Sequence, residues 1–361
     1  MKTVLCALEF PPAIGGVETY YSKLVEYWPD EISVIDNREN KLLSKHLPFF
    51  KWLTAFNTIL STVKNLKPDW FIAGEVLPIG TALYFASRFK SLKYAVVLHG
   101  LDFSLATAFF WKRAICKRVL KNASIIFCAN SKTLKDVQDF LGQTEKIILA
   151  NPGVDQTVPT VRVELLNGLR TNYGLENAFV LTTIGRLVKR KGVDAVISAL
   201  PEIIKQVPQI RYAIIGNGPE ETALRHAVSE LKLEQYVIFL TNITDEIKWA
   251  WLSLSDLFIM VARQIKGDYE GFGIVYLEAN LFSKPVISGK SGGVIDAVED
   301  GVTGVMVDEN SVEAIAEAVI SLAKDSELRN RLGEAGKKRV LSNFFWKNKV
   351  ALMHEKLKMN L

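Results

Sequence analysis

Two acidic residues flank a short glycine-containing segment in the second half of the sequence. Glu270 stands directly before Gly-Phe-Gly-Ile, and Glu278 follows four residues after that segment. In a helix that begins here, a rise of 1.5 Å per residue puts the two carboxylates on the order of 12 Å apart. That separation exceeds the roughly 5 to 9.5 Å of a glycosidase carboxylate pair. It fits the two ends of a nucleotide sugar, whose diphosphate would lie along the helix N-terminus between the acids.

A basic turn lies upstream of these acids. The segment 185–192 reads Gly-Arg-Leu-Val-Lys-Arg-Lys-Gly and contains Arg186 and Lys191. A forked guanidinium and a flexible ammonium within one loop suit the binding of a diphosphate. The alternative is a solvated basic turn, because charge runs usually face water.

Small or polar residues also follow two expected strands near the N-terminus. Gly15 and Gly16 let the backbone approach a ligand at a helix N-terminus. The same two residues also fit an ordinary turn that binds nothing. His99 comes after the segment 94–98, with Asp102 three residues further on. A histidine at the end of a strand can hydrogen-bond a polar substrate or serve the structure alone.

Three phosphate or metal motifs can be set aside. Gly216 and Gly218 begin a tight turn, but no third glycine follows at the spacing of a dinucleotide fingerprint. Gly-Lys-Ser at 289–291 lacks a P-loop's leading glycine, since Lys284 occupies that position. The sequence contains no Asp-x-Asp pair. We therefore expect no metal and no cofactor, with phosphate charge met by Arg186, Lys191 and backbone amides.

The elements that would position these residues alternate between short β-branched segments and helical patterns, which is typical of parallel α/β units. The first half contains six candidate strands, at 3–8, 32–35, 70–73, 94–98, 124–128 and 147–149. The second half contains six more, at 179–184, 212–215, 237–239, 257–261, 286–287 and 305–307. Each half can build a doubly wound sheet, and ligands bind beyond the carboxyl ends of such strands.

The pattern lapses between residues 154 and 173, which marks a connection between domains. We therefore predict an N-terminal domain over 1–163 and a C-terminal domain over 164–343. The last segment, 344–361, has helical spacing, and we expect it to pack back on the first domain.

Composition is that of a folded, soluble chain. The 361 residues are 49% hydrophobic and 23% charged, with mean hydropathy +0.15. The longest charge-free runs hold 12 residues, fewer than the roughly 18 that a membrane span needs. The N-terminus lacks a signal-peptide cleavage region, so we expect a cytoplasmic protein. The three cysteines, Cys6, Cys116 and Cys128, stand far apart in apolar stretches and are expected to be reduced.

The positive charge is concentrated in the first half. Residues 1–165 contain 20 basic residues (Lys and Arg) and 15 acidic residues (Asp and Glu). Residues 166–361 contain 24 basic and 24 acidic residues. Basic and aromatic residues interleave in two stretches: Lys41, Lys45, His46, Phe49, Phe50, Lys51 and Trp52; then Phe109, Phe110, Trp111, Lys112, Arg113, Lys117 and Arg118. This composition suits an anionic membrane surface. The alternative is amphipathic helices whose aromatic residues lie in the core. No nucleic-acid motif accompanies the charge, so nucleic acid is not an expected partner.

Taken together, these motifs resemble the family 4 retaining glycosyltransferases of GT-B fold, in which two Rossmann-like domains face each other across a cleft. The resemblance covers nearly the whole chain. It is carried by GGVE at 15–18, HG at 99–100, NPGVD at 151–155, GRLVKRKG at 185–192, GNGPE at 216–220, EGFGIVYLEA at 270–279 and SGGVIDAVEDGVTG at 291–304.

The resemblance implies a role for each matched position. The catalytic set would be Glu270, His99, Arg186 and Lys191. Glu270 would hold the sugar hydroxyls, His99 would contact the donor sugar, and Arg186 with Lys191 would neutralise the leaving diphosphate.

The remaining implied positions bind the donor or the acceptor. Donor binding would add the ribose contact of Glu278, the backbone of Gly16, the turn of Gly216 and Gly218, and the amides of Phe272, Gly273 and Ile274. The acceptor would meet Gly15, Gly16, His99 and Asp102. The leaving phosphate oxygen would take the acceptor's proton on the same face of the sugar.

Within this family, the stretch 260–279 is most similar to mannosyltransferases that use GDP-mannose and act on phosphatidylinositol-type and other lipid acceptors. The implied partners are a nucleotide-sugar donor, a lipid-linked or glycan acceptor and an anionic membrane surface. Two positions depart from the family pattern: Val261 replaces a common proline, and Leu-Thr-Asn at 240–242 replaces a glycine-containing turn beside the nucleotide base.

Three alternatives to this function remain at the level of sequence. The same fold could use UDP-glucose or UDP-N-acetylglucosamine with a soluble or polysaccharide-precursor acceptor. A binding protein could retain the nucleotide-sugar site without transfer activity, although the intact set of Arg186, Lys191, Glu270 and Glu278 argues against this. A nucleotide-sugar epimerase would turn over its substrate without any acceptor.

Overall fold

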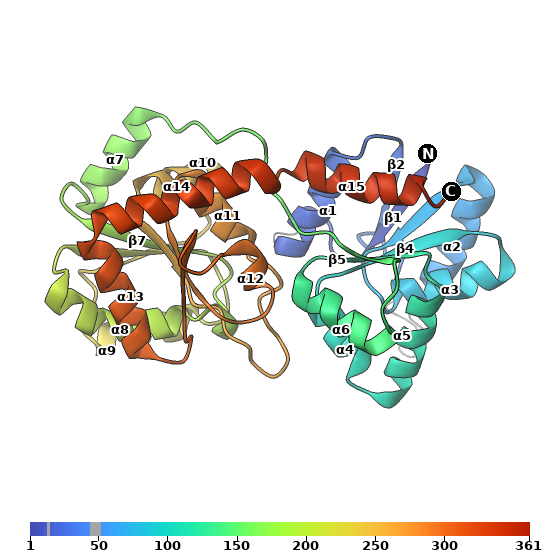
Figure 1. The fold of residues 1–361 in the computed structure, drawn as a ribbon, viewed down its shortest axis with the longest axis horizontal. Helices are drawn as coiled ribbons and strands as arrows, with labels where there is room; N and C mark the ends of the chain where they lie inside the picture. The colour runs from blue at the N-terminus through green and yellow to red at the C-terminus, as the bar shows by residue number, and fades with distance from the viewer. Residues whose placement is uncertain (13–14, 44–51) are drawn as a thin grey trace. The chain divides into compact units, whose positions relative to one another are not determined.

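The computed structural model describes residues 1–12, 15–43 and 52–361, which form two α/β units. Unit 1 comprises Met1–Pro152 together with Trp346–Leu361, and unit 2 comprises Gly153–Phe345. Each unit contains one parallel six-stranded sheet with helices on both faces (Figure 1). The alternating pattern of the sequence predicts this architecture, and the structure confirms it.

The sheet of unit 1 has the strand order β2-β1-β3-β4-β5-β6. Its strands are β1 (Thr3–Ala7), β2 (Ile32–Asp36), β3 (Trp70–Ala73), β4 (Lys93–Leu98), β5 (Ile125–Cys128) and β6 (Ile147–Leu149). Its helices are α1 (Gly16–Glu26), α2 (Trp52–Leu66), α3 (Ile79–Phe89), α4 (Leu101–Thr107), α5 (Phe110–Asn122), α6 (Ser131–Leu141) and the last helix of the chain, α15 (Trp346–Lys358).

The sheet of unit 2 has the strand order β12-β11-β10-β7-β8-β9. Its strands are β7 (Phe179–Ile184), β8 (Ile210–Ile215), β9 (Val237–Leu240), β10 (Leu257–Met260), β11 (Val286–Gly289) and β12 (Gly304–Val307). Its helices are α7 (Val163–Tyr173), a 3-10 turn (Lys189–Lys191), α8 (Val193–Gln206), α9 (Glu221–Glu230), α10 (Asp245–Leu254), α11 (Ile274–Leu281), α12 (Val294–Ala297), α13 (Val312–Lys324) and α14 (Ser326–Asn343).

Six strands, β1, β3, β5, β7, β10 and β11, are buried at every residue and so on both faces, which is why they read as continuous apolar runs. In β8, Tyr212 and Ile214 pack into one hydrophobic cluster, while Ala213 and Ile215 pack into a second cluster. Successive side chains of a strand point to opposite faces, so the sheet of unit 2 lies between two apolar layers. The cysteines Cys6, Cys116 and Cys128 are buried and free, and they serve as core residues.

The division between the units falls earlier than the lapse in sequence pattern suggests. We predict a boundary after residue 163, whereas unit 2 begins at Gly153. The Val154 N–H donates to the Phe344 carbonyl at 2.7 Å, which ties the connecting segment to the end of α14. Unit 2 also extends to Phe345, two residues beyond the predicted 343. The connecting segment that begins at Gly153 thus belongs to unit 2 although it precedes the first helix of that unit. Backbone hydrogen bonds attach it, and such bonds leave no pattern in the sequence.

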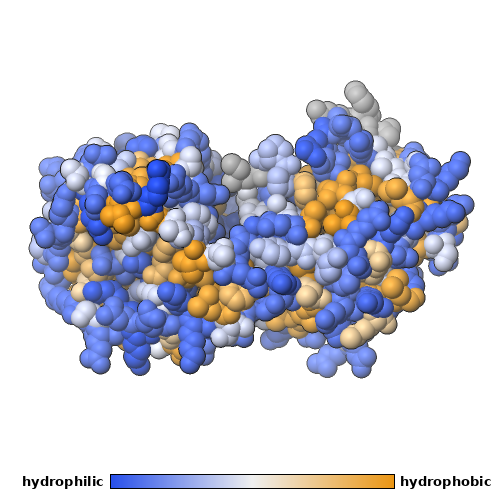
Figure 2. Space-filling view, turned by 90° about the horizontal axis from the view of Figure 1, so that it is seen from above, coloured by the Kyte–Doolittle hydropathy of each residue, from blue (hydrophilic) through white to orange (hydrophobic). Residues whose placement is uncertain are grey.

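The surface is mixed in character. Figure 2 shows one face, on which hydrophilic side chains predominate and apolar residues form separate patches. Across the described part of the chain, none of the helices combines the length and the apolarity that a membrane span requires.

Candidate functional site

The basic turn and Glu270 meet at the switch point of the sheet in unit 2. Strands β7 and β10 are neighbours, and the chain proceeds from them toward opposite edges of the sheet. Ligands of open α/β sheets bind beyond the carboxyl ends of the strands at such a point. Gly185 and Lys191 follow β7, and Glu270 follows β10. The topology therefore brings together residues that lie about 80 positions apart in the sequence.

Glu270 is the buried acid of this site, with 7% of its surface exposed. Its Oε2 atom lies 2.6 Å from Lys191 Nζ and 2.5 Å from Arg190 Nη1. Burial alone would raise the pKa of the Glu270 carboxyl, but the charges and hydrogen bonds of Lys191 and Arg190 outweigh burial and lower it. Glu270 is thus an ionised carboxylate held between two cations.

A second set of contacts fixes the basic turn against the loop before Glu270. Arg190 Nε also lies 3.3 Å from Asp268 Oδ2. The Arg263 N–H donates to the Arg190 carbonyl at 2.8 Å, and Arg263 Nη2 lies 2.5 Å from Asp194 Oδ2. The two loops are therefore joined by backbone and side-chain contacts, so Arg190 and Glu270 have little freedom to separate.

The sequence predicts that Arg186 and Lys191 act together on the diphosphate. In the structure, the Arg186 side chain does not join Lys191 at Glu270. Its side chain is exposed, and it forms no ion pair with any residue that the structure describes. Lys191 packs back over the end of β7, where a Cβ added to Gly185 would lie 3.7 Å from Lys191 Nζ. The structure thus brings Lys191 to Glu270, with Arg190 as the second cation.

The start of α11 provides the predicted backbone amides. Gly273 caps this helix with φ +81°, and a Cβ there would lie 2.4 Å from the Tyr276 ring, so only glycine fits. Phe272 is buried and packs near Phe344, with ring centroids 5.9 Å apart. Ile274 is the first helical residue, and a helix leaves the N–H groups at its start without intrahelical partners. Within this first turn, the Tyr276 N–H donates to the Gly273 carbonyl at 3.0 Å.

Glu278 lies within α11 and pairs with a cation of its own. Lys248 Nζ, on α10, is 3.1 Å from Glu278 Oε1 and 3.7 Å from the centroid of the Trp249 ring. Glu270 and Glu278 therefore contact different cations on different elements. Sequence reasoning missed Lys248, because nothing in the pattern of α10 marks it, and passed over Arg190 within the basic run.

The predicted glycine turn of Gly216 and Gly218 has a packing role. A Cβ on Gly216 would lie 2.0 Å from the Gly185 carbonyl oxygen, and a Cβ on Gly218 would lie 2.2 Å from the Leu187 carbonyl oxygen. Both glycines let the loop after β8 approach the loop after β7. Their residue type is explained by this approach.

In unit 1, His99 is held by two tyrosines of α1. Tyr21 Oη donates to the Gly74 carbonyl and lies 2.9 Å from His99 Nε2. Because the tyrosine proton is used on Gly74, His99 Nε2 must be the donor in this pair, which leaves Nδ1 as the acceptor of a neutral ring. Burial lowers the pKa of His99 to about 4, consistent with that neutral form. The Tyr20 ring packs edge-on against His99 at 5.0 Å.

Asp102 supports the backbone around His99. Its Oδ1 accepts hydrogen bonds from the N–H groups of His99 (3.0 Å) and Gly100 (2.9 Å). Burial raises the pKa of Asp102 to about 6, partly opposed by these hydrogen bonds. Its Oδ2 is buried and accepts no hydrogen bond from the described residues.

Glu75 is an acid that sequence reasoning missed. It follows β3, which neighbours β1 at the switch point of unit 1, and its Oε1 accepts a hydrogen bond from the Leu8 N–H at 3.1 Å. Burial raises the pKa of Glu75 to about 8, and the carboxylates of Asp102 and Glu9 add to the effect. Its position close after the predicted strand 70–73 could have marked Glu75 as a candidate site residue.

The glycine pair of unit 1 leaves the first turn of α1 bare. Gly16 is the first residue of α1, and a Cβ added there would meet no atom within 4 Å. A Cβ on Gly15 would meet the end of the Glu18 side chain, which is flexible. Packing alone therefore does not require glycine at position 16.

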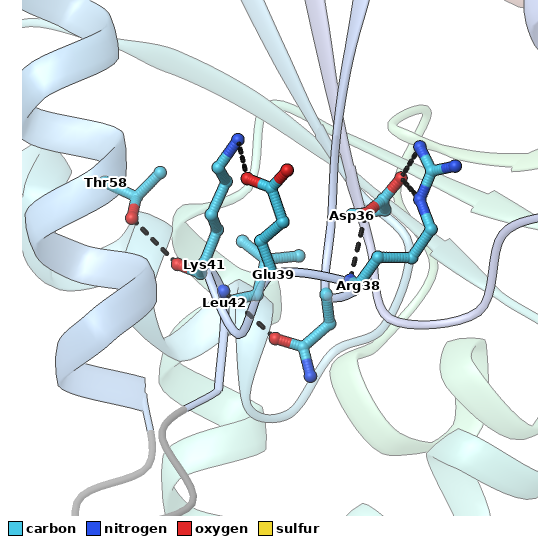
Figure 3. Close-up of polar contacts among 7 residues, drawn as sticks. Asp36, Arg38, Glu39, Lys41, Leu42 and Thr58 are labelled. Carbon is cyan, nitrogen blue, oxygen red and sulfur yellow. Dashed lines mark hydrogen bonds and ion pairs between the residues drawn. The ribbon is translucent and has the colours of Figure 1, made fainter.

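Unit 1 also contains a polar cavity of about 340 Å³ beside β2 and α2. Its charged side chains pair with one another (Figure 3): Arg38 Nη2 lies 2.5 Å from Asp36 Oδ2, and Lys41 Nζ lies 2.7 Å from Glu39 Oε2. The Thr58 hydroxyl donates to the Lys41 carbonyl at 2.8 Å. The described residues that line the cavity therefore offer balanced charge and no basic cluster for a phosphate.

Lys41 opens the first basic and aromatic stretch of the sequence. Of the other members of that stretch, Trp52 stacks on Phe85 with ring centroids 4.9 Å apart. The remaining members lie outside the described residues: Lys45, His46, Phe49, Phe50 and Lys51.

Comparisons with known proteins give the family of the chain. Residues 169–339 match the family model described as glycosyl transferases group 1. A GDP-mannose-dependent alpha-(1-6)-phosphatidylinositol monomannoside mannosyltransferase of Mycobacterium tuberculosis is 32% identical over 96% of this chain and 95% of its own. The enzyme of that name from Mycolicibacterium smegmatis is 29% identical over 98% and 97%.

Solved structures share the fold. Anabaena HepE in complex with UDP superimposes with a TM-score of 0.83 at 19% identity, over 99% of this chain and 100% of that one. A sucrose-phosphate synthase of Thermosynechococcus elongatus has a TM-score of 0.80 at 18% identity, over 100% and 99%. No three His, Cys, Asp or Glu side chains within residues 1–12, 15–43 and 52–361 are grouped to hold a metal ion. The two sheets, the clustered Lys191 and Glu270 and the full-length similarity lead to one conclusion: the chain belongs to the group 1 glycosyltransferases and is a glycosyltransferase of GT-B fold.

Proposed function

We propose that this glycosyltransferase moves mannose from GDP-mannose to a lipid-linked acceptor at the cytoplasmic face of a membrane, with retention of anomeric configuration and without a metal. The observation that carries the donor chemistry is the pairing of Lys191 and Arg190 with the buried Glu270 at the start of α11. The choice of mannose and of a lipid acceptor rests on relatives that are 29% and 32% identical over nearly their whole length.

In this proposal, Lys191 exchanges Glu270 for the diphosphate when the donor binds. Arg190 stays on Glu270 and keeps it ionised, so that the carboxylate can accept hydrogen bonds from sugar hydroxyls. Arg186, exposed and without an ion-pair partner among the described residues, supplies the second positive charge to the diphosphate. The amides of Phe272, Gly273 and Ile274 face the phosphates.

The remaining roles follow the same logic. Glu278 binds the ribose hydroxyls, with Lys248 holding the carboxylate in place at 3.1 Å. In unit 1, the backbone of Gly15 and Gly16 borders the diphosphate and the acceptor, and neutral His99 accepts a hydrogen bond from a hydroxyl of the donor sugar at Nδ1. Asp102 fixes the turn that carries His99 through its two backbone hydrogen bonds.

The reaction balances without a protein base. The bond between the sugar's anomeric carbon and the phosphate oxygen breaks, and a bond from the acceptor oxygen forms on the same face. The acceptor's hydroxyl proton moves to the departing phosphate oxygen, so the products are GDP and the mannoside. Catalysis then consists of positioning and of stabilising the charge on the leaving group.

A donor panel tests this assignment. The purified protein is incubated with GDP-mannose, UDP-glucose, UDP-N-acetylglucosamine or UDP-galactose, with EDTA and then with Mg²⁺, and both binding and slow hydrolysis are measured. The proposal expects GDP-mannose to bind and to be hydrolysed in EDTA. Preference for a UDP-sugar would contradict the donor, and strict dependence on Mg²⁺ would contradict the metal-free chemistry.

A pair of glutamate variants tests the site itself. Glu270→Gln is expected to lower donor turnover at least about 100-fold, because the amide cannot pair with two cations. Glu230→Gln, an exposed glutamate at the end of α9, is the matched control and is expected to retain wild-type turnover. Near-normal turnover in Glu270→Gln would remove this residue from the site.

A further inference from the structure

Unit 1 exposes a cluster of large apolar side chains at the turn between α4 and α5. Phe110 is 86% exposed, Phe109 is 59%, Leu105 is 58% and Trp111 is 52%. Figure 1 draws α4 and α5 side by side at the lower end of unit 1. We refer to these four residues as the aromatic tip. Large apolar side chains that gather on a surface mark an interaction site.

The members of the aromatic tip lie close together along the chain. Leu105 belongs to α4, Phe109 lies in the turn, and Phe110 and Trp111 are the first two residues of α5. The apolar core of α5 is made by other residues, Cys116, Val119 and Leu120, on its buried face. The aromatic rings are thus not used to hold the helix in place. This rules out, for this stretch, the alternative in which its aromatic residues lie in the core.

The segment that carries most of the aromatic tip has charged residues of a single sign. Residues 103–122 contain five Lys and Arg and no Asp or Glu. Lys112 Nζ lies 5.4 Å from the centroid of the Phe109 ring and 5.5 Å from that of Trp111. Arg113 and Lys117 lie 4.8 and 5.5 Å from the Phe140 ring of α6. Cations adjacent to exposed rings match the two layers of a bilayer surface, anionic head groups and the acyl boundary beneath.

We infer that the aromatic tip inserts into an anionic lipid bilayer, with Lys112, Arg113, Lys117 and Arg118 on the head groups. A second copy of the chain fits less well, because two such tips would bring five positive charges on each side together. The inference deepens the proposed function and rests on it for the acceptor alone. It names the surface by which unit 1 reaches a membrane that carries the acceptor.

Vesicle binding tests the inference with the full chain. Sedimentation uses vesicles of phosphatidylcholine alone or with 30% phosphatidylglycerol, and wild type is expected to bind only the anionic ones. Phe110→Ser is expected to lower the partition coefficient about tenfold or more. The double variant Lys112→Gln with Lys117→Gln is expected to lower it about 20-fold, and salt should weaken the wild type similarly. Ile295→Ser in unit 2, where the side chain is 52% exposed, is the matched control and should bind as wild type does.

Insertion depth gives a second measurement. Brominated lipids should quench part of the tryptophan fluorescence of wild type, and Trp111→Phe should lose that part while still binding. Equal vesicle binding by wild type and Phe110→Ser would overturn the inference. So would concentration-dependent dimerisation that Phe110→Ser abolishes while vesicle binding stays the same.

Slow hydrolysis of GDP-mannose separates this inference from the proposed function. The tip variants should hydrolyse the donor at the wild-type rate, since all donor residues of unit 2 are untouched. Normal vesicle binding with no GDP-mannose hydrolysis would defeat the proposed function and leave the aromatic tip standing. Normal hydrolysis of GDP-mannose with no vesicle binding would overturn the role of the aromatic tip and leave the proposed donor chemistry in place.

Discussion

Glu270 carries its charge inside unit 2 because two cations compensate for its burial. Lys191 and Arg190 both contact the same oxygen, Oε2, at 2.6 and 2.5 Å. A carboxyl whose pKa is lowered in this way stabilises the fold above the unfolded value of about 4.5, and it loses that contribution as the pH falls through the folded value. The site therefore has an acidic limit set by Glu270.

Arg190 is a positioning residue in this account. Arg190→Gln removes one of two cations, so the pKa of Glu270 rises and the acidic limb of the donor turnover profile moves to higher pH. Arg190→Lys should restore most of that limb, because it keeps the charge. The measurement is donor hydrolysis from pH 4 to 8, with the exposed Arg225→Gln as control. An unchanged limb in Arg190→Gln would show that Lys191 alone sets the charge of Glu270.

Glu75 is expected to make the stability of the fold depend on pH in the opposite direction. Its pKa is about 8 in the fold and about 4.5 when unfolded, so the folded state holds the proton across that interval and stability falls as the pH rises through it. Glu75→Gln keeps the shape without the acid. We expect the variant to match wild type at pH 5 and to exceed it by about 1 to 3 kcal/mol at pH 8. Urea unfolding at both pH values, with the exposed Glu31→Gln as control, checks this; equal stabilities at pH 8 would contradict it.

At the scale of elements, two glycine turns that look alike in the sequence differ in the structure. Gly218 is required for packing, since a Cβ would lie 2.2 Å from the Leu187 carbonyl oxygen. Gly16 opens α1 with free space around the missing Cβ. The first turn of α1 is therefore open to a ligand in a way that the turn after β8 is not.

Alanine substitutions should separate these two roles. Gly16→Ala is expected to leave stability unchanged or raise it by about 0.5 to 1 kcal/mol, since alanine favours a helix, while donor turnover falls about tenfold or more. Gly218→Ala is expected to lower stability by about 3 kcal/mol through the clash. Thermal unfolding and GDP-mannose hydrolysis measure both effects. Full donor turnover in Gly16→Ala would show that this position does not belong to the donor site.

Sequence patterns predicted the elements well and the contacts between them less well. The twelve strands among the described residues fall within two residues of the predicted ranges at their starts and ends, because apolar β-branched runs are local signals. Lys248 reaches Glu278 from another helix, and no local pattern marks such a pairing. The sequence left the exposure of Phe110 open between a surface and a core position, because an aromatic residue near a helix start fits both, and the structure shows it exposed.

At the scale of the whole molecule, the last helix returns to the first unit. Trp346 of α15 packs edge-on against Tyr20 of α1 at 5.5 Å, and His354 Nε2 lies 2.7 Å from Asp30 Oδ2. The hydrogen bond to His354 lowers the pKa of Asp30. Residues more than 300 positions apart along the chain are thereby in contact.

Trp346→Ala is expected to weaken unit 1 selectively. Loss of this buried ring should cost about 3 to 5 kcal/mol. Hydrogen exchange should show faster exchange in β1 and α1, while β7 and β8 of unit 2 keep their protection. Lys347→Ala, one residue on and exposed, is the control. Equal loss of protection in both sheets would contradict separate stabilities for the units.

The return of α15 also bears on the order in which a nascent chain can fold. Domains generally fold in the order of their synthesis, but every residue of Gly153–Phe345 leaves the ribosome before Trp346–Leu361. Unit 2 is therefore complete first, although it comes second along the chain. A released chain of residues 1–345 would hold a complete unit 2 and a unit 1 in which Tyr20 and Trp28 lack the helix that covers them. That apolar surface is one that chaperones would meet during synthesis and not afterwards.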